Sequence, residues 1–282
     1  MTAATRLRGR FGPWAAVTGA SDGIGRACAQ QLAAAGLNLV LVARRQPLLD
    51  RLAAELSTAH GIRTRVLALD LTTDDAIAKV DTDTLDLDVG LLVAAAGFGT
   101  SGLFLDADPA AEADMLRVNC AATLGLAHRF ARRFAARRET GGVRGGMVLM
   151  GSLVAFQGVP FAAHYAATKA YVQALAEALR LELRAQGITV VASAPGPVRS
   201  GFGTRAGMQI TSGASPEAVA RGTLATLVSG GGTATPGLLS KLLTWSLAPL
   251  PRGARSRIMG EVMRGMTQHR APPPRLQRPD AA

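Results

Sequence analysis

Cysteines are scarce in this sequence. Its 282 residues include only Cys28 and Cys120, each set beside alanines in a helical pattern. Disulfide-rich scaffolds and Cys-ligated metal centres need several cysteines at close spacing. We therefore expect neither a disulfide framework nor a metal site, and a reducing, cytoplasmic setting agrees best with this composition.

Long apolar runs are missing from the first 30 residues, which carry arginines and then a glycine-rich stretch. Without an apolar run before a small-residue cleavage site, we expect no signal peptide. Aromatic residues make up only 4% of the chain, whereas apolar residues make up 48% and are mostly Ala, Leu and Val. This composition suits helices packed closely on a sheet, and the length fits one large α/β domain.

Acidic residues are also in deficit, with 20 Asp and Glu against 31 Lys and Arg and a net charge of +11. A basic face is the usual electrostatic mark of nucleic-acid binding. Here the arginines are divided among residues 6–10, residues 129–138 and the C-terminal tail. We therefore expect a solvated basic surface and no nucleic-acid partner.

Short apolar runs alternate with helical patterns along the chain, which is typical of a doubly wound parallel sheet covered on both faces. Residues 1–12 read as an N-terminal extension, 13–237 as one α/β domain, 238–269 as a helical extension and 270–282 as a disordered Pro- and Arg-rich tail. The strands are expected at 14–18, 38–43, 65–69, 91–95, 147–150, 189–194 and 233–235, and helices at 24–35, 47–60, 110–138 and 162–186.

The helix expected over 162–186 has two apolar stripes. One stripe can cover the sheet, whereas the other would face water in a single chain. The pattern predicts a subunit contact there and hence a homodimer or homotetramer. The alternative is a helix that is fully buried within one chain. The stripes are Ala163, Ala167, Ala170, Ala174, Ala178 and Leu181, and Val172, Leu175, Leu179 and Leu183.

A glycine-rich turn joins the first expected strand to the first helix. It reads Thr-Gly-Ala-Ser-Asp-Gly-Ile-Gly over 18–25. Side chains would block a ligand from such a turn, whereas free N–H groups and the dipole of the helix that follows would hold a pyrophosphate. The residues expected to bind the cofactor here are Gly19, Ser21, Asp22, Gly23, Ile24 and Gly25.

The end of the second strand predicts which dinucleotide binds. NAD-binding units carry an acidic residue there for the ribose hydroxyls, but this strand ends in Ala43, Arg44 and Arg45. Guanidinium groups bind a 2′-phosphate, so we expect NADP(H) with Arg44 as a phosphate ligand. The alternative is that both arginines are merely solvated. Asp70 after the third strand could accept a hydrogen bond from adenine or cap a helix opening at Thr72 or Thr73.

Four polar residues are candidates for chemistry. Tyr165 and Lys169 are four residues apart at the start of a helix, so their side-chain ends can converge. A nearby ammonium and a cationic nicotinamide would lower the tyrosine pKa for proton transfer. Ser152 would polarise a substrate carbonyl. Asn119, an amide among apolar neighbours, could hold a water behind Lys169 or bond its own helix.

Together these motifs resemble the short-chain dehydrogenase/reductase family, over about residues 13–237. The motifs are the glycine-rich turn, Asn119, Ser152, Tyr165-Ala-Ala-Thr-Lys169 and Pro195-Gly-Pro-Val198. The resemblance implies a Rossmann fold, Tyr165 as general acid/base, Lys169 on the nicotinamide ribose, Ser152 on the carbonyl and Asn119 in a proton relay. It also implies a substrate lid over 201–215. Further cofactor contacts are expected at Leu71, Ala94, Ala96, Gly97, Pro195, Gly196, Val198 and Ser200.

One motif departs from the family. Where members usually have Asn-Asn-Ala-Gly after the fourth strand, this chain has Ala94-Ala-Ala-Gly97. The missing amides mainly support the strand and the adenosine side of the site, so the departure bears on cofactor affinity more than on the chemistry.

The expected function is NADP(H)-dependent hydride transfer between nicotinamide and a ketone or secondary alcohol. An alternative is a non-enzymatic dinucleotide-binding or sensor protein. Residues 238–257, rich in Leu and Arg, are expected to pack over the substrate cleft or to make a weak membrane-surface contact. The expected substrate pocket is apolar and contains Val154, Phe156, Phe161, Phe202 and Met208.

Overall fold

The computed structural model describes residues 3–139, 141–237, 246–247 and 249–267. Its centre is a parallel sheet of seven strands in the order β3-β2-β1-β4-β5-β6-β7. The strands are β1 (Trp14–Thr18), β2 (Asn38–Ala43), β3 (Thr64–Ala68), β4 (Val89–Ala94), β5 (Gly145–Met150), β6 (Ile188–Ser193) and β7 (Gly232–Ala234). Every expected strand is present, with its bounds shifted by no more than two residues, and the doubly wound fold is confirmed.

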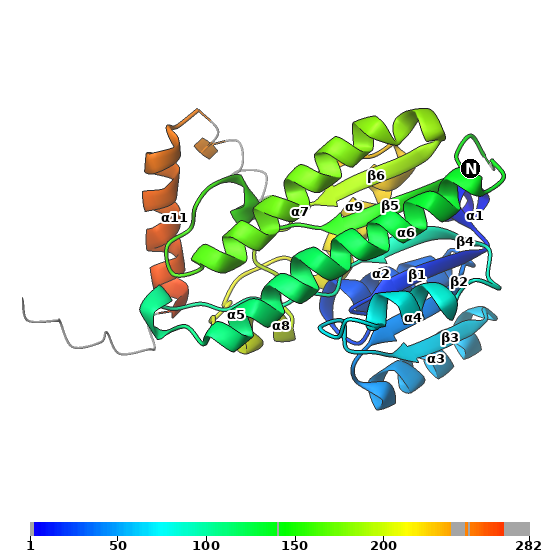
Figure 1. The fold of residues 1–282 in the computed structure, drawn as a ribbon, viewed down its shortest axis with the longest axis horizontal. Helices are drawn as coiled ribbons and strands as arrows, with labels where there is room; N and C mark the ends of the chain where they lie inside the picture. Colours follow the sequence, from blue (N-terminus) through cyan, green and yellow to red (C-terminus); the bar gives the residue numbers. More distant parts are fainter. Residues whose placement is uncertain (1–2, 140, 238–245, 248, 268–282) are drawn as a thin grey trace, which may run out of the picture.

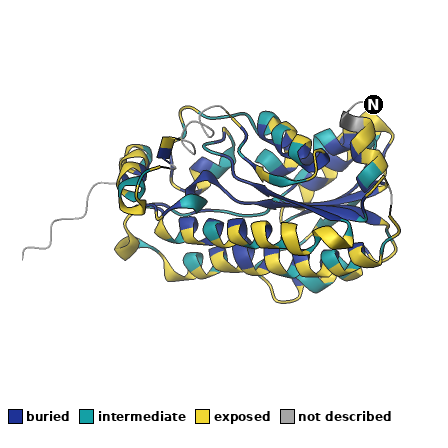
Figure 2. Cartoon of the chain, turned by 90° about the horizontal axis from the view of Figure 1, so that it is seen from above, coloured by how far each residue is buried: buried dark blue, intermediate teal, exposed yellow. Residues whose placement is uncertain are grey.

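Helices cover both faces of the sheet (Figures 1 and 2). One face carries α1 (Ala3–Phe11), α2 (Gly23–Ala34), α3 (Gln46–His60) and α9 (Pro216–Val228). The other carries α4 (Ala76–Thr82), α6 (Thr123–Ala136) and α7 (Ala163–Glu182). The buried strands lie between helices whose outer surfaces are exposed (Figure 2).

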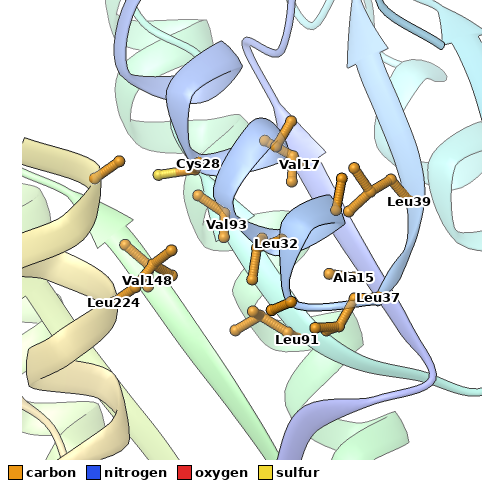
Figure 3. Close-up of a cluster of buried hydrophobic side chains, with 14 of the residues drawn as sticks. Ala15, Val17, Cys28, Leu32, Leu37, Leu39, Leu91, Val93, Val148 and Leu224 are labelled. Atoms are coloured by element: carbon orange, nitrogen blue, oxygen red, sulfur yellow. The ribbon is translucent and has the colours of Figure 1, made fainter. Parts of the chain in front are cut away.

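Large aliphatic side chains fill the space between the sheet and α2 (Figure 3). Leu32 and Cys28 of α2 are fully buried against Val93 of β4, and Leu224 of α9 lies beside Val148 of β5. On the other face, the rings of Phe130 and Phe134 in α6 are fully buried. These two apolar layers hold the strand ends, and the loops that leave them, in fixed positions.

The single helix expected over 110–138 is interrupted. It forms α5 (Pro109–Leu116), the π-helical segment η2 (Arg117–Ala122) and α6. Periodicity cannot reveal a π segment, because one extra residue per turn leaves most of the apolar pattern in place. Asn119 lies in η2, so the widened turn sets the direction of its side chain.

The two stripes of α7 have different surroundings. Val172 is buried against the sheet and Leu175, Leu179 and Leu183 pack partly against it. The stripe with Ala163, Ala167, Ala174, Ala178 and Leu181 is exposed, and the side chain of Ala170 is partly exposed. A helix fully buried within one chain is therefore wrong, whereas the subunit contact stays a prediction.

The remaining described elements are four short helices and one longer one. They are the 3-10 helices η1 (Phe104–Asp106), η3 (Leu153–Phe156) and η4 (Arg184–Gln186), the one-turn helix α8 (Gly201–Arg205) and the longer helix α11 (Arg252–Thr267). Helix α11 stands at one end of the molecule, beyond the first turn of α7 (Figure 1). No helix among the described residues is long and apolar enough to cross a bilayer.

Candidate active site

A cavity of about 370 Å³ lies where the carboxyl ends of β1, β2, β4 and β5 meet. In open parallel sheets this edge is where ligands bind. One part of the cavity is lined by the glycine-rich turn and the arginines after β2, and another by apolar side chains from α8 and α11. Tyr165, Lys169 and Ser152 also line it.

The glycine-rich turn packs closely on the backbone that follows β4, whereas its close approach to a ligand stays a prediction. Gly19 has a φ of +68°, and a Cβ there would lie 2.8 Å from the carbonyl oxygen of Ala95. Asp22 caps α2, because its Oδ1 accepts a hydrogen bond of 2.7 Å from the N–H of Gly23. The first turn of α2 therefore faces the cavity with its dipole and N–H groups, a suitable place for a pyrophosphate.

Both arginines after β2 line the cavity, but they differ in their partners. Arg45 Nη2 donates a 3.0 Å hydrogen bond to Ser21 Oγ in the glycine-rich turn. Arg44 Nη1 lies 3.8 Å from Asp70 Oδ2, and its side chain is 66% exposed. From the sequence both guanidinium groups were considered and Arg44 was named as the phosphate ligand, because spacing does not reveal that Arg45 turns toward Ser21.

Asp70 has a local role beside the cavity. Its Oδ1 accepts hydrogen bonds of 3.0 Å from the N–H and the hydroxyl of Thr72. Asp70 therefore holds a turn. Helix α4 begins only at Ala76, so the alternative in which Asp70 caps a helix opening at Thr72 or Thr73 is wrong. Asp70 and Leu71 both line the cavity.

Tyr165 and Lys169 are both buried on the first turns of α7. The Lys169 Nζ lies 5.8 Å from the centre of the Tyr165 ring and donates a 2.9 Å hydrogen bond to the carbonyl oxygen of Met150. Lys169 thus lies beside the Tyr165 ring, because one helical turn separates the two residues. The convergence of the ammonium with the tyrosine hydroxyl stays a prediction.

Burial sets the titration of this pair. Burial raises the pKa of Tyr165 to about 12, and this effect is larger than that of a hydrogen bond with Ser152, which lowers the pKa. Burial lowers the pKa of Lys169 to about 8. Burial is a cause that the motif does not reveal, and the fall in the tyrosine pKa expected beside both the ammonium and a cationic nicotinamide stays a prediction. At neutral pH the phenol therefore keeps its proton and the lysine its charge.

Ser152 begins the 3-10 helix η3 directly after β5 and is buried. Its hydroxyl donates a 3.5 Å hydrogen bond to the carbonyl oxygen of Pro195 and accepts one of 3.4 Å from the N–H of Val154. Ser152 also interacts with the Tyr165 side chain, and both residues line the cavity.

Asn119 is fully buried, and its side chain bonds neighbouring segments and not the backbone of its own helix. Its Oδ1 accepts a hydrogen bond of 3.2 Å from the N–H of Phe98, and its Nδ2 donates to the Phe98 carbonyl (2.9 Å) and to Thr168 Oγ1 (3.0 Å). A Cβ on Gly97 would lie 2.8 Å from Asn119 Oδ1 and 3.3 Å from Lys169 Nζ. Asn119 thus joins the segment after β4 to α7, and a relay water stays a prediction.

The segment expected as a lid lies over the tyrosine. The Phe202 ring of α8 is 5.5 Å from the Tyr165 ring, centre to centre. Val154, Phe202 and Met208 line the cavity as expected, whereas Phe156 and Phe161 do not. The Phe161 ring instead lies under the Arg264 guanidinium, 5.5 Å away.

Helix α11 forms part of the cavity wall, and the sequence did not predict which of its residues do so. Met259, Val262, Met263 and Met266 line the cavity. Their spacing of three and four residues is the signal that could have identified them. This helix favours the interpretation of the C-terminal extension as a cleft cover, while residues 238–245 and 248 lie outside the described residues.

Most residues expected to bind the cofactor line this cavity. Gly19, Ser21, Asp22, Gly23, Ile24, Gly25, Arg44, Asp70, Leu71, Ala96, Gly97, Tyr165, Lys169, Pro195, Gly196, Val198 and Ser200 do so. Ala94 does not, because it is buried inside the sheet between Thr18 of β1 and Leu149 of β5. Arg45, Ala95, Phe98 and Arg205 line the cavity without having been predicted. Across the described residues, no group of three or more His, Cys, Asp or Glu side chains could hold a metal ion.

Comparisons with known proteins agree with this geometry. The short chain dehydrogenase family profile matches residues 13–210. A very-long-chain 3-oxoacyl-CoA reductase of Podospora anserina is 38% identical over 194 residues, which are 66% of this chain and 54% of that protein. The chain thus spans about half the length of this relative.

Solved structures resemble the chain over more of its length. A short-chain dehydrogenase from Sphingobium yanoikuyae in complex with NADPH has a TM-score of 0.76 and 30% identity, covering 95% of this chain and 99% of that one. A bulky-bulky ketone specific alcohol dehydrogenase from Comamonas testosteroni has a TM-score of 0.72 and 30% identity, covering 86% and 96%. With its glycine-rich turn, its Tyr165–Lys169 pair and a profile match over most of its length, the chain belongs to the short-chain dehydrogenase family of oxidoreductases.

Proposed function

We propose that the protein transfers a hydride between NADP(H) and a ketone or secondary alcohol whose substituents are bulky and apolar. The observation that carries the proposal is the position of Tyr165 and Ser152 in one cavity, between an anion-binding helix terminus and a wall rich in methionine. The sensor alternative would not need two hydroxyl groups and a buried lysine at that junction.

The residues present fit a dinucleotide. The turn at Gly19 leaves no room for a side chain, α2 directs its N-terminus at the cavity, and Arg44 and Arg45 stand where a 2′-phosphate would lie. Bound NADPH would supply the hydride. The solved relative from Sphingobium, which is in complex with NADPH, supports this choice of cofactor.

Each catalytic candidate has a physical role in ketone reduction. With its pKa near 12, Tyr165 is protonated at neutral pH and can donate its phenolic proton to the carbonyl oxygen. Ser152 donates a hydrogen bond to the same oxygen as negative charge develops on it. The ammonium of Lys169 stabilises the phenolate that remains and binds the nicotinamide ribose, and Asn119 keeps the segment at Gly97 and the catalytic helix in register.

The substrate class follows from the wall of the cavity. Phe202, Met208, Met259, Met263 and Met266 offer no charged group to a substrate. Methionine side chains are flexible and polarisable, so they adapt to large apolar shapes. The relatives named for very-long-chain 3-oxoacyl-CoA and for bulky ketones support a substrate of this kind.

Turnover of a panel of apolar ketones with NADPH tests the proposal. Tyr165→Phe should abolish reduction, because it removes the proton donor and changes little volume. Tyr171→Phe is the matched control, since Tyr171 is the other tyrosine of the chain, lies on the same helix and is 40% exposed. Turnover by Tyr165→Phe at the rate of Tyr171→Phe would refute the assignment.

Cofactor choice is tested separately. Removing a charge-assisted hydrogen bond of roughly 1.5 to 3 kcal/mol should weaken NADPH binding by about one to two powers of ten in Arg44→Ala or Arg45→Ala. Arg51→Ala, an exposed arginine of α3 outside the cavity, is the control. NADH should lose little affinity in every variant. An unaltered protein that prefers NADH would contradict the choice of NADP(H).

The exposed stripe of α7 supports a proposed homodimer or homotetramer. Ala174→Glu should then reduce the mass measured by light scattering, whereas Ala54→Glu on the exposed face of α3 should not. A monomer already in the unaltered protein would refute the assembly.

Both cysteines are buried free thiols, which supports the proposed cytoplasmic location.

A further inference from the structure

A one-turn helix far along the chain closes over the glycine-rich turn. Arg205, the last residue of α8, places its Nη1 2.9 Å from Oδ2 of Asp22, and both residues line the cavity. The contact is close along the rest of α8 as well. A Cβ on Gly23 would lie 3.3 Å from the Cβ of Ser200, and one on Gly201 would lie 2.7 Å from Asp22 Oδ2.

The position of Asp22 conflicts with anion binding. One carboxylate oxygen caps α2 through the N–H of Gly23, which stabilises the helix. The same carboxylate brings negative charge to the helix terminus where the cofactor pyrophosphate would bind, and like charges at short range repel each other. Arg205 neutralises this charge through the other oxygen. The pair is partly exposed, with side chains 46% and 33% accessible, so its direct contribution to folding is small.

We propose that Arg205 is a ligand of the cofactor pyrophosphate that Asp22 holds near the site until the cofactor arrives. The guanidinium then exchanges a carboxylate for the pyrophosphate oxygens, which carry more charge and accept paired hydrogen bonds. Arg205 and Phe202 both belong to α8, so binding of the pyrophosphate by Arg205 also holds the Phe202 ring in place over Tyr165. The inference rests on the proposed function, since it takes NADP(H) as the ligand.

The dissociation constant of NADPH at fixed ionic strength tests this inference, read from nicotinamide fluorescence. Arg205→Gln should weaken NADPH by about tenfold, because a charge-assisted contact is lost. Asp22→Asn should strengthen NADPH binding severalfold, since the amide oxygen keeps the helix cap while Arg205 is released and the repulsion is removed. In the double variant the gain from Asp22→Asn should be smaller, because no guanidinium remains to release.

Two controls make the test specific. Arg199→Gln, an exposed arginine of the same segment outside the cavity, should leave the affinity unchanged. Adenosine 2′-monophosphate carries no pyrophosphate, so its affinity, measured by calorimetry, should be the same in Arg205→Gln and in the unaltered protein. Hydrogen exchange over 201–205 should slow when NADPH binds the unaltered protein and should not slow in Arg205→Gln.

The outcomes separate this inference from the proposed function. Unchanged NADPH affinity in Arg205→Gln would overturn the inference, and so would equal losses in Arg205→Gln and Asp22→Asn, which would mark a purely structural tie. Equal losses of NADPH and adenosine 2′-monophosphate in Arg205→Gln would overturn it as well. A protein that shows the expected binding pattern but reduces no ketone would overturn the proposed function and support the inference.

Discussion

Lys169 gives the folded protein a measurable dependence on pH. It is buried, and its pKa falls to about 8 from an ordinary value of 10.5. Below pH 8 both the folded and the unfolded chain carry the charge, and the folded chain bears the cost of a desolvated ammonium. Between pH 8 and 10.5 the unfolded chain binds more protons, so the free energy of unfolding must rise with pH. Above 10.5 both states are neutral.

The size of this rise follows from the two pKa values. They lie about 2.5 pH units apart, and at about 1.4 kcal/mol per unit the total is about 3.5 kcal/mol. Tyr165 acts in the opposite direction at higher pH. Its pKa rises to about 12 from 10, so its contribution is complete below pH 10 and is lost as the pH rises through 12. Below about pH 10, Tyr165 therefore adds little to the pH dependence of stability.

Urea denaturation of the unaltered protein and of Lys169→Met between pH 7 and pH 10 is the assay. Methionine keeps a similar length and volume and cannot be charged. Other groups also titrate between pH 7 and pH 10, so the decisive quantity is the difference between the two curves of unfolding free energy against pH. The Cys28 thiol lies above this range, because burial raises its pKa to about 12. Lys79→Met, at an exposed lysine paired with Asp75, is the control. Parallel curves for the unaltered protein and Lys169→Met would refute the burial argument.

Three further predictions concern single contacts. Gly97→Ala should destabilise the fold by about 1 to 3 kcal/mol, because the added Cβ overpacks against Asn119, and it should also reduce turnover. Gly253→Ala is the control, since its Cβ would meet nothing within 4 Å and should change neither property. Urea denaturation and steady-state kinetics of both variants measure this, and equal effects would contradict it. The Cys28 thiol, with its pKa near 12, should react with a thiol reagent only after denaturant is added, and rapid labelling of the native protein would be inconsistent with its burial. Thr18→Val should cost about 0.5 to 1.5 kcal/mol of stability, because it removes the hydrogen bond to the partly buried N–H of Ala96, and an unchanged urea midpoint would exclude this.

The fold was readable from the sequence because its signals are local. Most strands are short runs rich in Val, Leu and Ala, and the glycine-rich turn stands directly between the first strand and α2. The Tyr165–Lys169 pair was equally readable, since one helical turn determines its geometry. These features depend on neighbours within a few residues of each other, which is the range over which periodicity and turn chemistry act.

The features that sequence reasoning missed depend on distant contacts. The partner of Arg45 is Ser21, that of Arg205 is Asp22, and the side chain of Asn119 bonds Phe98, 21 residues away. No spacing rule links such residues. The desolvation that raises the tyrosine pKa depends in the same way on everything packed around the ring, whereas a motif names only the charged groups near it.

The missing amides after β4 show how such distant contacts maintain the site. The family usually has two asparagines where this chain has Ala94 and Ala95. In the structure the backbone there is held from outside the segment: the N–H of Ala96 donates a 3.0 Å hydrogen bond to the buried hydroxyl of Thr18. Asn119 binds both polar backbone groups of Phe98. Since β1 and the π segment η2 supply these hydrogen bonds, the chain can keep Gly97 against Lys169 without amides of its own after β4.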